Sequence, residues 1–494
     1  MKLPKKKTSA SNQEPPVVAP NAASKSEDSL CHQKQAKKGT SRRRILQWGA
    51  AAAAGVAFPH IWVPRPARAA GGGAGSIRHL IYIRLSGGFR FPCAFNADVA
   101  EQFNPFGLQS DGVPSGVDWG VSSLLSRSAF LDGEGRRDLG MKPVHQFADR
   151  ITVMPAVDHE PLAGRADGNH ETGLERYYTG YVNGEAGFFT RIFRGLKGRY
   201  AAAEEAGEVI LPPFVMGGAA MARGFGEYAA YRPPVLNGAT FERFSAQGEG
   251  VPSWATDLVG QADRRMRDRQ HPALREQVDS YIRSRAATAS YADIFDSDAL
   301  KVDRASDELI DGISNTELRS LFGNGRTSAN LRLALRLFQF GCPAVYLDQG
   351  GYDYHSGEEN ALPGAIESLN HQLSALFFAL EKMQHPEGGS YWDHTLVVLG
   401  SEFSRTARGG RFNSARGSDH NGDNSTRWMS MPFFGGAVPG GRVVGASTSR
   451  DSLEAEGKVY SYRSVMNTLM EGLGCDESVF FPGDECVQEL YGDS

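Results

Sequence analysis

The sequence predicts an α/β fold with a mostly parallel central sheet that is flanked by helices on both faces. Two observations lead to this fold class. Short runs that are apolar almost throughout alternate along the chain with longer segments in which apolar residues recur every three or four positions. Uninterrupted apolar runs are typical of strands buried on both faces, and strands that alternate with helices form parallel sheets through crossover connections.

The expected elements follow in chain order. The strand-like runs are "HLIYIRL", "ITVMPAV", "PAVYL" and "TLVVLG", and helical periods fall between and after them. In the predicted helix 328–341, Leu331, Leu335 and Phe338 share one face, and Gly341 is the residue at which the helix is expected to end. The predicted strands are 79–85, 151–157, 343–347 and 395–400; the predicted helices are 171–182, the period that begins at about 256, 274–285, 328–341, 362–383 and 462–474.

The N-terminal part of the chain is expected to serve export. Residues 1–40 are rich in Lys, Ser and Gln and are predicted to be disordered. The segment "SRRRILQ" then fits a twin-arginine export signal in which Arg42 and Arg43 are the pair, and the signal peptide is predicted to span 41–69. Residues 70–76, with their glycine run, are predicted to be a flexible joint.

A membrane anchor is the alternative for this segment. Its apolar stretch is shorter than the roughly 20 residues that span a bilayer, and Pro59 and His60 interrupt it. We therefore predict a removable signal and no stable membrane anchor. The export partner is then the twin-arginine translocase, and the expected location is periplasmic or extracellular.

The chain that follows the signal is long enough for one large α/β domain, and residues 77–490 are predicted to form it. Residues 185–255 are rich in Gly, Pro and aromatic side chains. They show short strands but few clear helices, and are predicted to be an irregular insertion in this domain.

Removal of the signal makes the protein strongly acidic. Residues 1–69 carry 13 Lys and Arg against 3 Asp and Glu, so the formal net charge changes from −4 to −14. A chain of this charge repels nucleic acid and anionic membranes, and no nucleic-acid binding is expected. No CxxC motif is present, and Cys475 and Cys486 either form a disulfide in an oxidising compartment or remain free thiols.

Polar side chains, most of them able to bind a metal ion, follow three of the predicted strands at their carboxyl ends. Ligand sites of open parallel sheets lie at this edge, so the three groups could converge on one crevice. Carboxylates together with imidazoles suit zinc, manganese or iron, whereas carboxylates alone favour magnesium or calcium. The groups are Asp158, His159, Asp167 and His170; Asp348, Asp353, His355, Glu358 and Glu359; and Ser401, Glu402, Arg405, Asp419, His420 and Asp423.

Each group also has a purely structural alternative. An Asp-x-His such as Asp353 and His355 is common in turns, where the carboxylate caps the backbone and the imidazole is solvated. Glu358 and Glu359 are then solvated residues that start the next helix, and His394 is expected to be a local cap. Arg405 and the arginines after it either clamp a phosphate or sulfate ester or belong to a solvated glycine-rich loop.

The order of several motifs resembles one known family. The segments "SRRRILQ", "HLIYIRLSGG", "NHETGLERYYTG", "GGYDYHS", "TLVVLGSEFSRT", "GSDHN" and "FFGGAVPGGRVVG" occur in the order expected of the Tat-exported domain of unknown function fifteen-oh-one. That family is a member of the alkaline phosphatase and sulfatase superfamily. The resemblance covers about 77–485 and implies an alkaline phosphatase-like fold with a metal site above the strand ends.

The resemblance implies metal ligands in all three polar groups. The Asp-x-His loop and the Asp-His pair match the family's pattern, and a Glu stands where an Asp ligand is usual. The implied cofactor is a divalent ion, namely zinc, manganese, magnesium or calcium. The residues implied as ligands are His170, Asp353, His355, Glu402, Asp419 and His420.

Two positions depart from the superfamily pattern. The first strand of superfamily enzymes ends in a metal-binding Asp, whereas this chain offers Ser86, Phe89 and Arg90 after its first strand, and Phe403 stands where a His or Asn ligand is usual. A two-metal displacement is therefore not expected, and we predict one ion or none. No nucleophile stands out in the expected place, and Thr172, at a helix N-terminus after His170, is the candidate.

The leading functional hypothesis is an exported, metal-dependent hydrolase of phosphate or sulfate esters, acting on a small molecule or a polysaccharide. In it, Arg405 neutralises the developing anionic charge. The alternative is a non-catalytic periplasmic or cell-surface binding protein that has lost the nucleophile and part of the metal site. A redox-associated partner is a third reading, although the missing CxxC argues against a bound iron–sulfur cluster.

Overall fold

The computed structural model separates the chain into two units, Met1–Leu46 and Gln47–Ser494, and all described residues belong to the second. The predicted disordered region, signal peptide and flexible joint therefore lie outside the described residues. The structure describes residues 77–101, 103–127, 139–160, 169–206, 210–236, 253–272, 275, 278, 294–295, 297–405, 420, 427–447 and 455–492.

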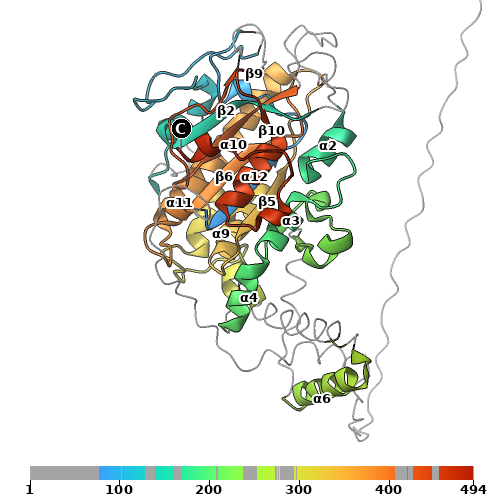
Figure 1. Ribbon diagram of the computed structural model, residues 1–494. Helices are drawn as coiled ribbons and strands as arrows, with labels where there is room; N and C mark the ends of the chain where they lie inside the picture. The colour runs from blue at the N-terminus through green and yellow to red at the C-terminus, as the bar shows by residue number, and fades with distance from the viewer. Residues whose placement is uncertain are drawn as a thin grey trace, which may run out of the picture. The chain divides into compact units, whose positions relative to one another are not determined.

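Eight strands form the central sheet, in the order β10-β2-β7-β6-β1-β5-β3-β4 (Figure 1). Strand β1 pairs in parallel with β5 and β6, whereas β7 is antiparallel to both of its neighbours, β2 and β6. The predicted mostly parallel sheet is confirmed. Its strands are β1 His79–Leu85, β2 Ile151–Asp158, β3 Phe214–Met216, β4 Val235–Leu236, β5 Ala344–Gln349, β6 Thr395–Gly400, β7 Trp428–Phe434 and β10 Tyr460–Ser461; β8 Ala446–Ser447 and β9 Ala455–Glu456 form a separate pair.

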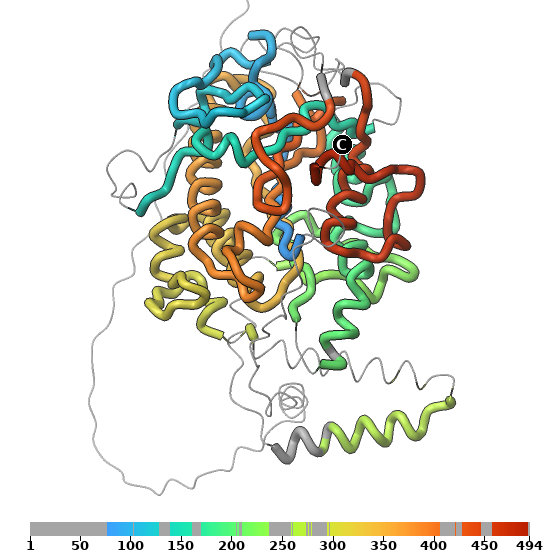
Figure 2. The backbone as a smooth tube through the Cα atoms, turned by 60° about the vertical axis from the view of Figure 1, so that its left-hand side comes forward, coloured from blue at the N-terminus to red at the C-terminus, as the bar shows by residue number. Residues whose placement is uncertain are grey.

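Alternate residues of β1 belong to two apolar cores, one on each face of the sheet. Ile81 and Ile83 share a core with α9 and α10, while Leu80 and Tyr82 share the other with α3 and α12. Successive strand residues point to opposite faces, so a strand with apolar residues at both sets of alternate positions needs helices on both faces of the sheet. Figure 2 shows α9 and α10 on one side of the sheet and α12 on the other, which confirms the predicted layers. The helices are α2 His170–Thr179, α3 Phe188–Gly195, α4 Lys197–Glu205, α6 Ser253–Arg269, α8 Asn315–Phe322, α9 Arg326–Phe338, α10 Glu358–Lys382, α11 Tyr391–His394 and α12 Tyr462–Gly472.

The segment 185–255 differs from the irregular insertion predicted for it. Its described part contains α3 and α4, and β3 pairs in parallel with both β5 and β4. The segment therefore supplies one edge of the central sheet. A short strand was expected in "VILPPFVMG", and β3 lies within this run, whereas β4 has only two residues and is too short for a periodic pattern to appear in the sequence.

Two further expectations concern covalent and membrane features. Cys475 and Cys486 are free in the structure, so it shows the thiol alternative and not the disulfide. Within the described ranges, no helix has both the length and the apolar character needed to cross a membrane.

Three histidines at the amino-terminal edge of the sheet form a contact chain. His79 Nε2 lies 3.2 Å from His385 Nε2, and the rings of His385 and His394 stack with their centroids 3.8 Å apart. The backbone N–H of Glu387 donates to His385 Nδ1, so a neutral His385 carries its proton on Nε2 and donates it to His79. Burial, followed by the charge of His394, lowers the pKa of His385 to about 3, and burial also lowers the pKa of His79.

Acidification is expected to destabilise the folded protein through these histidines. In the unfolded chain a histidine binds a proton below about pH 6.5, whereas His79 and His385 stay neutral when folded. The contribution of His385 to stability is therefore full above about pH 6.5 and falls between about pH 6.5 and 3, by up to about 1.4 kcal/mol per pH unit, and His79 acts in the same direction. Urea unfolding at about pH 7.5, 6 and 5 should show a shallower pH dependence in His385→Gln than in the wild type. Equal slopes for the two proteins would contradict this assignment.

Candidate metal centre

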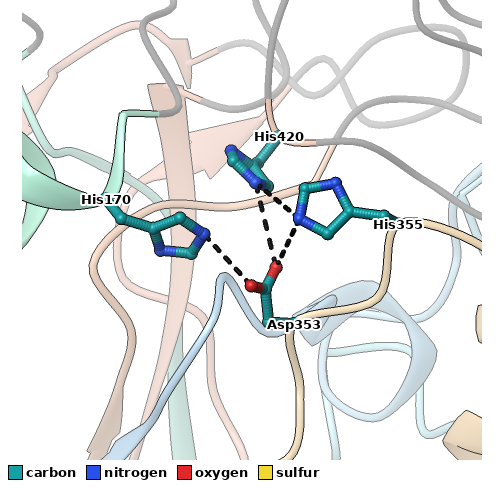
Figure 3. A group of neighbouring side chains, drawn as sticks. All are labelled: His170, Asp353, His355 and His420. Atoms are coloured by element: carbon teal, nitrogen blue, oxygen red, sulfur yellow. Dashed lines mark hydrogen bonds and ion pairs between the residues drawn. The ribbon is translucent and has the colours of Figure 1, made fainter.

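The carboxyl ends of three parallel strands bring together four metal-capable side chains. His170 begins α2, Asp353 and His355 lie in the loop between β5 and α10, and His420 follows β6. One ligand atom from each of the four lies within 4.8 Å of those from the other three. Figure 3 shows the three imidazole rings arranged around the Asp353 carboxylate. The predicted convergence of three polar groups at this edge therefore occurs.

Three of the ligand atoms form a compact triangle. His355 Nε2 lies 3.2 Å from Asp353 Oδ1 and 3.2 Å from His420 Nε2, and His420 Nε2 lies 3.8 Å from Asp353 Oδ1. Ligands that surround an ion tetrahedrally at zinc–nitrogen distances are about 3.3 Å from one another. The triangle has the size of one face of such a coordination shell.

His170 approaches the other carboxylate oxygen of Asp353. Its Nε2 lies 3.3 Å from Asp353 Oδ2, and this buried nitrogen has no hydrogen-bond partner among the described residues. Its Nδ1 lies 3.4 Å from Glu402 Oε1, and this hydrogen bond raises the pKa of His170. A histidine that binds a metal typically gives its second ring nitrogen to a carboxylate in this way. The orphaned Nε2 therefore fits a fourth ligand.

Glu402 holds His170 and stands outside the four-residue group. Its carboxylate accepts hydrogen bonds from the backbone N–H of Gly87 at 2.8 Å and from Arg84 Nη1 at 3.1 Å. Burial would raise the pKa of Glu402, but the hydrogen bond with His170 and the charge of Arg84 hold it below its ordinary value. The side chain is 1 % exposed, so this carboxylate is a fixed charge behind the centre.

Asp353 forms a hydrogen-bonded ion pair with Arg405. The distance from Arg405 Nη2 to Asp353 Oδ1 is 2.6 Å, and the guanidinium is fully buried. Burial would raise the pKa of Asp353, but the hydrogen bond and charge of Arg405 hold it below its usual value. Asp353 and His355 are 44 % and 56 % exposed, so the centre is open to solvent on one side.

Two glycines of the turn after β1 permit this close packing. Gly87 has φ +111°, and a Cβ there would lie 2.4 Å from the backbone nitrogen of Asp353. A Cβ on Gly88 would lie 2.5 Å from the ring of Phe403. That ring packs against His170 and, in a stacked arrangement, against His420, so it borders the centre without offering a ligand. The turn contributes backbone at the place where the resemblance implied an acidic side chain.

The remaining predicted residues lie in several places. Thr172 is on the first turn of α2, half-buried, with its backbone N–H bonded to Asn169. Asp419 and the arginines after Arg405 up to Arg416 lie outside the described residues. Glu358 starts α10 as expected, but it is 3 % exposed and pairs with Arg90, so the expectation that it is solvated was wrong.

Arg84 is the functional residue that the sequence reasoning missed. It binds Asp348 through two nitrogens, at 3.1 and 2.8 Å, as well as Glu402. The available signal was a lone charged residue inside an otherwise apolar strand, because such a side chain is rarely buried unless it is paired.

A second group of metal-capable side chains, His385, Glu387 and His394, lies at the opposite edge of the sheet. Its nitrogens are already engaged, since His385 Nδ1 accepts from a backbone N–H and His394 Nε2 bonds the carbonyl of Gly388. The group at the carboxyl edge is the better fit to an ion.

Comparison with known proteins gives one family. Residues 140–490 match the family described as a protein of unknown function, DUF1501. No curated protein matches the sequence.

Remote likenesses to solved structures also occur. Ps i-CgsB, in complex with k-i-k-neocarrahexaose, is 10 % identical, with 84 % of this chain and 75 % of that chain covered and a TM-score of 0.32. A protein in the alkaline phosphatase superfamily from Vibrio parahaemolyticus is 12 % identical, covering 88 % and 76 %, with a TM-score of 0.29. The lipoteichoic acid synthase LtaP from Listeria monocytogenes is 11 % identical, covering 91 % and 80 %, with a TM-score of 0.29.

Proposed function

The chain belongs to the DUF1501 family of proteins of unknown function, and we propose that it is an exported hydrolase of phosphate or sulfate esters that uses one divalent ion. The observation that carries the proposal is the convergence of three imidazole nitrogens and one carboxylate at the carboxyl edge of a parallel sheet. Ligand sites of such sheets lie at that edge. The half-exposed side of the centre leaves room for a substrate.

Zinc is the ion that suits this ligand set best. Magnesium and calcium prefer shells made of oxygen, whereas a set dominated by imidazoles suits zinc and its neighbours among the transition metals. The proposed ligands are His170, Asp353, His355 and His420. When bound, the ion would supply Lewis acidity to the reaction.

The surrounding residues of the chain orient the ligands. Glu402 accepts a hydrogen bond from the Nδ1–H of His170 and so orients Nε2 toward the centre. Arg84 and the Gly87 N–H keep Glu402 in place, and the ring of Phe403 packs against the rings of His170 and His420. Such supporting contacts raise ligand basicity and limit rotation of the rings.

The substrate class follows from the resemblance of the motifs to the alkaline phosphatase and sulfatase superfamily. A centre with a divalent ion would attract an anionic ester group, carried by a small molecule or a polysaccharide. Thr172 remains the candidate nucleophile because it follows His170 on the first turn of α2.

Hydrolysis assays test the proposal directly. Protein that has been reconstituted with zinc or manganese should hydrolyse members of a panel of phosphate and sulfate monoesters and diesters. Protein treated with a chelator should lose this activity and regain it when the ion is restored. No turnover of any panel member by fully metal-loaded protein would refute the hydrolase.

Phe403 favours a second candidate, a binding protein that has kept the centre without catalysis. The ring takes the place of a ligand beside His170 and His420 and restricts the centre to the four residues named. A glycan array with metal-loaded and metal-free protein separates the two functions. Metal-dependent capture of a glycan that the protein does not cleave would favour the binding protein.

Export through the twin-arginine pathway is part of the proposal, and the pair Arg42 and Arg43 is its expected determinant. The double substitution Arg42→Lys, Arg43→Lys should retain the full-length chain in the cytoplasm, because the translocase reads the arginine pair. Cell fractionation measures the distribution. Arg44→Lys is the control and should leave export intact; equal export of both variants contradicts the assignment.

A further inference from the structure

Arg405 occupies a cage of oxygen atoms beneath the centre. Its Nε donates to the carbonyl of Gly88 at 2.8 Å, and its Nη1 donates to the carbonyl of Tyr354 at 2.8 Å. Its Nη2 lies 3.1 Å from the carbonyl of Tyr352, bonds the carbonyl of Gly87, and lies 2.6 Å from Asp353 Oδ1. Backbone carbonyls combined with a carboxylate are the ligands that hard cations prefer. In this protein a guanidinium takes that position.

The cage connects three segments, and two of them, the loop after β5 and the chain after β6, also supply ligands of the centre. Gly87 and Gly88 belong to the turn after β1, Tyr352 to Tyr354 belong to the loop after β5, and Arg405 itself follows β6. The guanidinium is fully buried, while the Asp353 carboxylate above it is 44 % exposed. The oxygen that Arg405 bonds, Asp353 Oδ1, is also the corner of the triangle that lies 3.2 Å from His355 Nε2 and 3.8 Å from His420 Nε2, so a permanent cation fixes the ligand atom itself.

We propose that Arg405 is the resident cation of the centre, which positions Asp353 and limits the protein to one exchangeable metal ion. This inference rests on the proposed metal centre. It gives Arg405 the role of positioning the ligand Asp353, in place of the role of neutralising the charge of the substrate that the sequence suggested. A second divalent ion on the oxygen atoms of the cage would have to occupy the place of the buried guanidinium, and such like-charge contacts are strongly unfavourable when they are shielded from water.

Zinc binding by equilibrium dialysis, with metal analysis of the dialysed protein, tests this role. Wild-type protein should bind one ion per chain. Arg405→Met should bind zinc about 10- to 100-fold more weakly, because supporting contacts of metal ligands have effects of this size. Arg405→Lys should fall between the two, since an ammonium keeps the charge but has only three donors for the oxygen atoms of the cage.

Arg336→Met is the matched control. Arg336 is also fully buried and bonds Asn315 at 2.8 Å and the carbonyl of Ile313 at 2.9 Å, but it lies on α9 and away from the centre. Its substitution should lower stability and leave zinc affinity unchanged. If Arg405→Met does not fold, the zinc affinity of Arg405→Lys and the number of zinc ions bound per wild-type chain still test the role of Arg405.

Three outcomes overturn the inference: two ions per wild-type chain, wild-type affinity in folded Arg405 variants, or an equal loss of affinity in Arg336→Met. Wild-type protein that binds one ion with the expected variant pattern, yet hydrolyses no ester, would refute the hydrolase while supporting the role of Arg405. Wild-type protein that binds no ion refutes both.

Discussion

His355→Ala and His420→Ala are each expected to weaken zinc binding by at least about 100-fold, since losing a direct ligand exceeds the 10- to 100-fold effect of losing a supporting contact. The rate at which the protein hydrolyses any ester substrate should fall together with its zinc affinity. Each variant removes one corner of the triangle in which the two Nε2 atoms lie 3.2 Å apart. Competition with a chromophoric chelator measures the affinity, and thermal unfolding measures its effect on stability.

The two variants separate ligand loss from damage to the fold. His355 is 56 % exposed, so its truncation should leave the metal-free protein as stable as the wild type, whereas His420 is only 6 % exposed and its truncation also leaves a cavity. Wild-type protein should gain about 2.7 kcal/mol of stability when free zinc is 100 times its dissociation constant, and His355→Ala should lose most of that gain.

His371→Ala is the control for these variants. Its Nε2 bonds the backbone carbonyl of Leu321 at 2.9 Å, so its loss removes a buried hydrogen bond at a place that is not part of the centre. Zinc affinity should remain at the wild-type value. Wild-type affinity in His355→Ala and His420→Ala as well would rule out the assigned centre.

Arg84→Met is expected to lower the free energy of unfolding by about 3–5 kcal/mol, because it removes one partner of a buried ion pair. Arg84 and Glu402 are 6 % and 1 % exposed, so the carboxylate would remain as a buried charge with a weaker set of partners. Burial is also what makes an unpaired carboxylate costly. Denaturant unfolding of the metal-free protein measures the loss.

Two further variants locate the origin of that loss. The double substitution Arg84→Met, Glu402→Gln removes the orphaned charge and should recover part of the stability. Arg194→Met breaks a doubly hydrogen-bonded pair with Glu227, which is 65 % exposed, and should cost less than about 1 kcal/mol. A loss in Arg84→Met as small as that in Arg194→Met would contradict the buried-pair assignment.

The central strands and their helices could be predicted because their signals are local. The runs that became β1, β2, β5 and β6 are apolar almost throughout, and α9 and α12 show a helical period in their own residues. Strand β7 was not predicted. It carries Pro432, which cannot donate to a ladder and argues against a central strand, yet β7 lies between β2 and β6. Its place depends on neighbours that are distant in the sequence.

The sequence by itself determined which metal-capable side chains stand at the carboxyl ends of the strands. Asp353, His355, His420 and His170 follow buried strands, and parallel strands present these ends at one edge. This placement requires only the order of apolar runs and polar residues, which is a property of the chain itself.

Only the tertiary structure decided the role of each side chain. The strand register pairs Arg84 with Asp348 on one side and with Gly400 on the other, and so brings Arg84 to Glu402. Glu402 consequently bonds His170, and the buried Arg405 guanidinium bonds Asp353. Register and side-chain direction arise from contacts between segments far apart in the chain, and no local pattern records them.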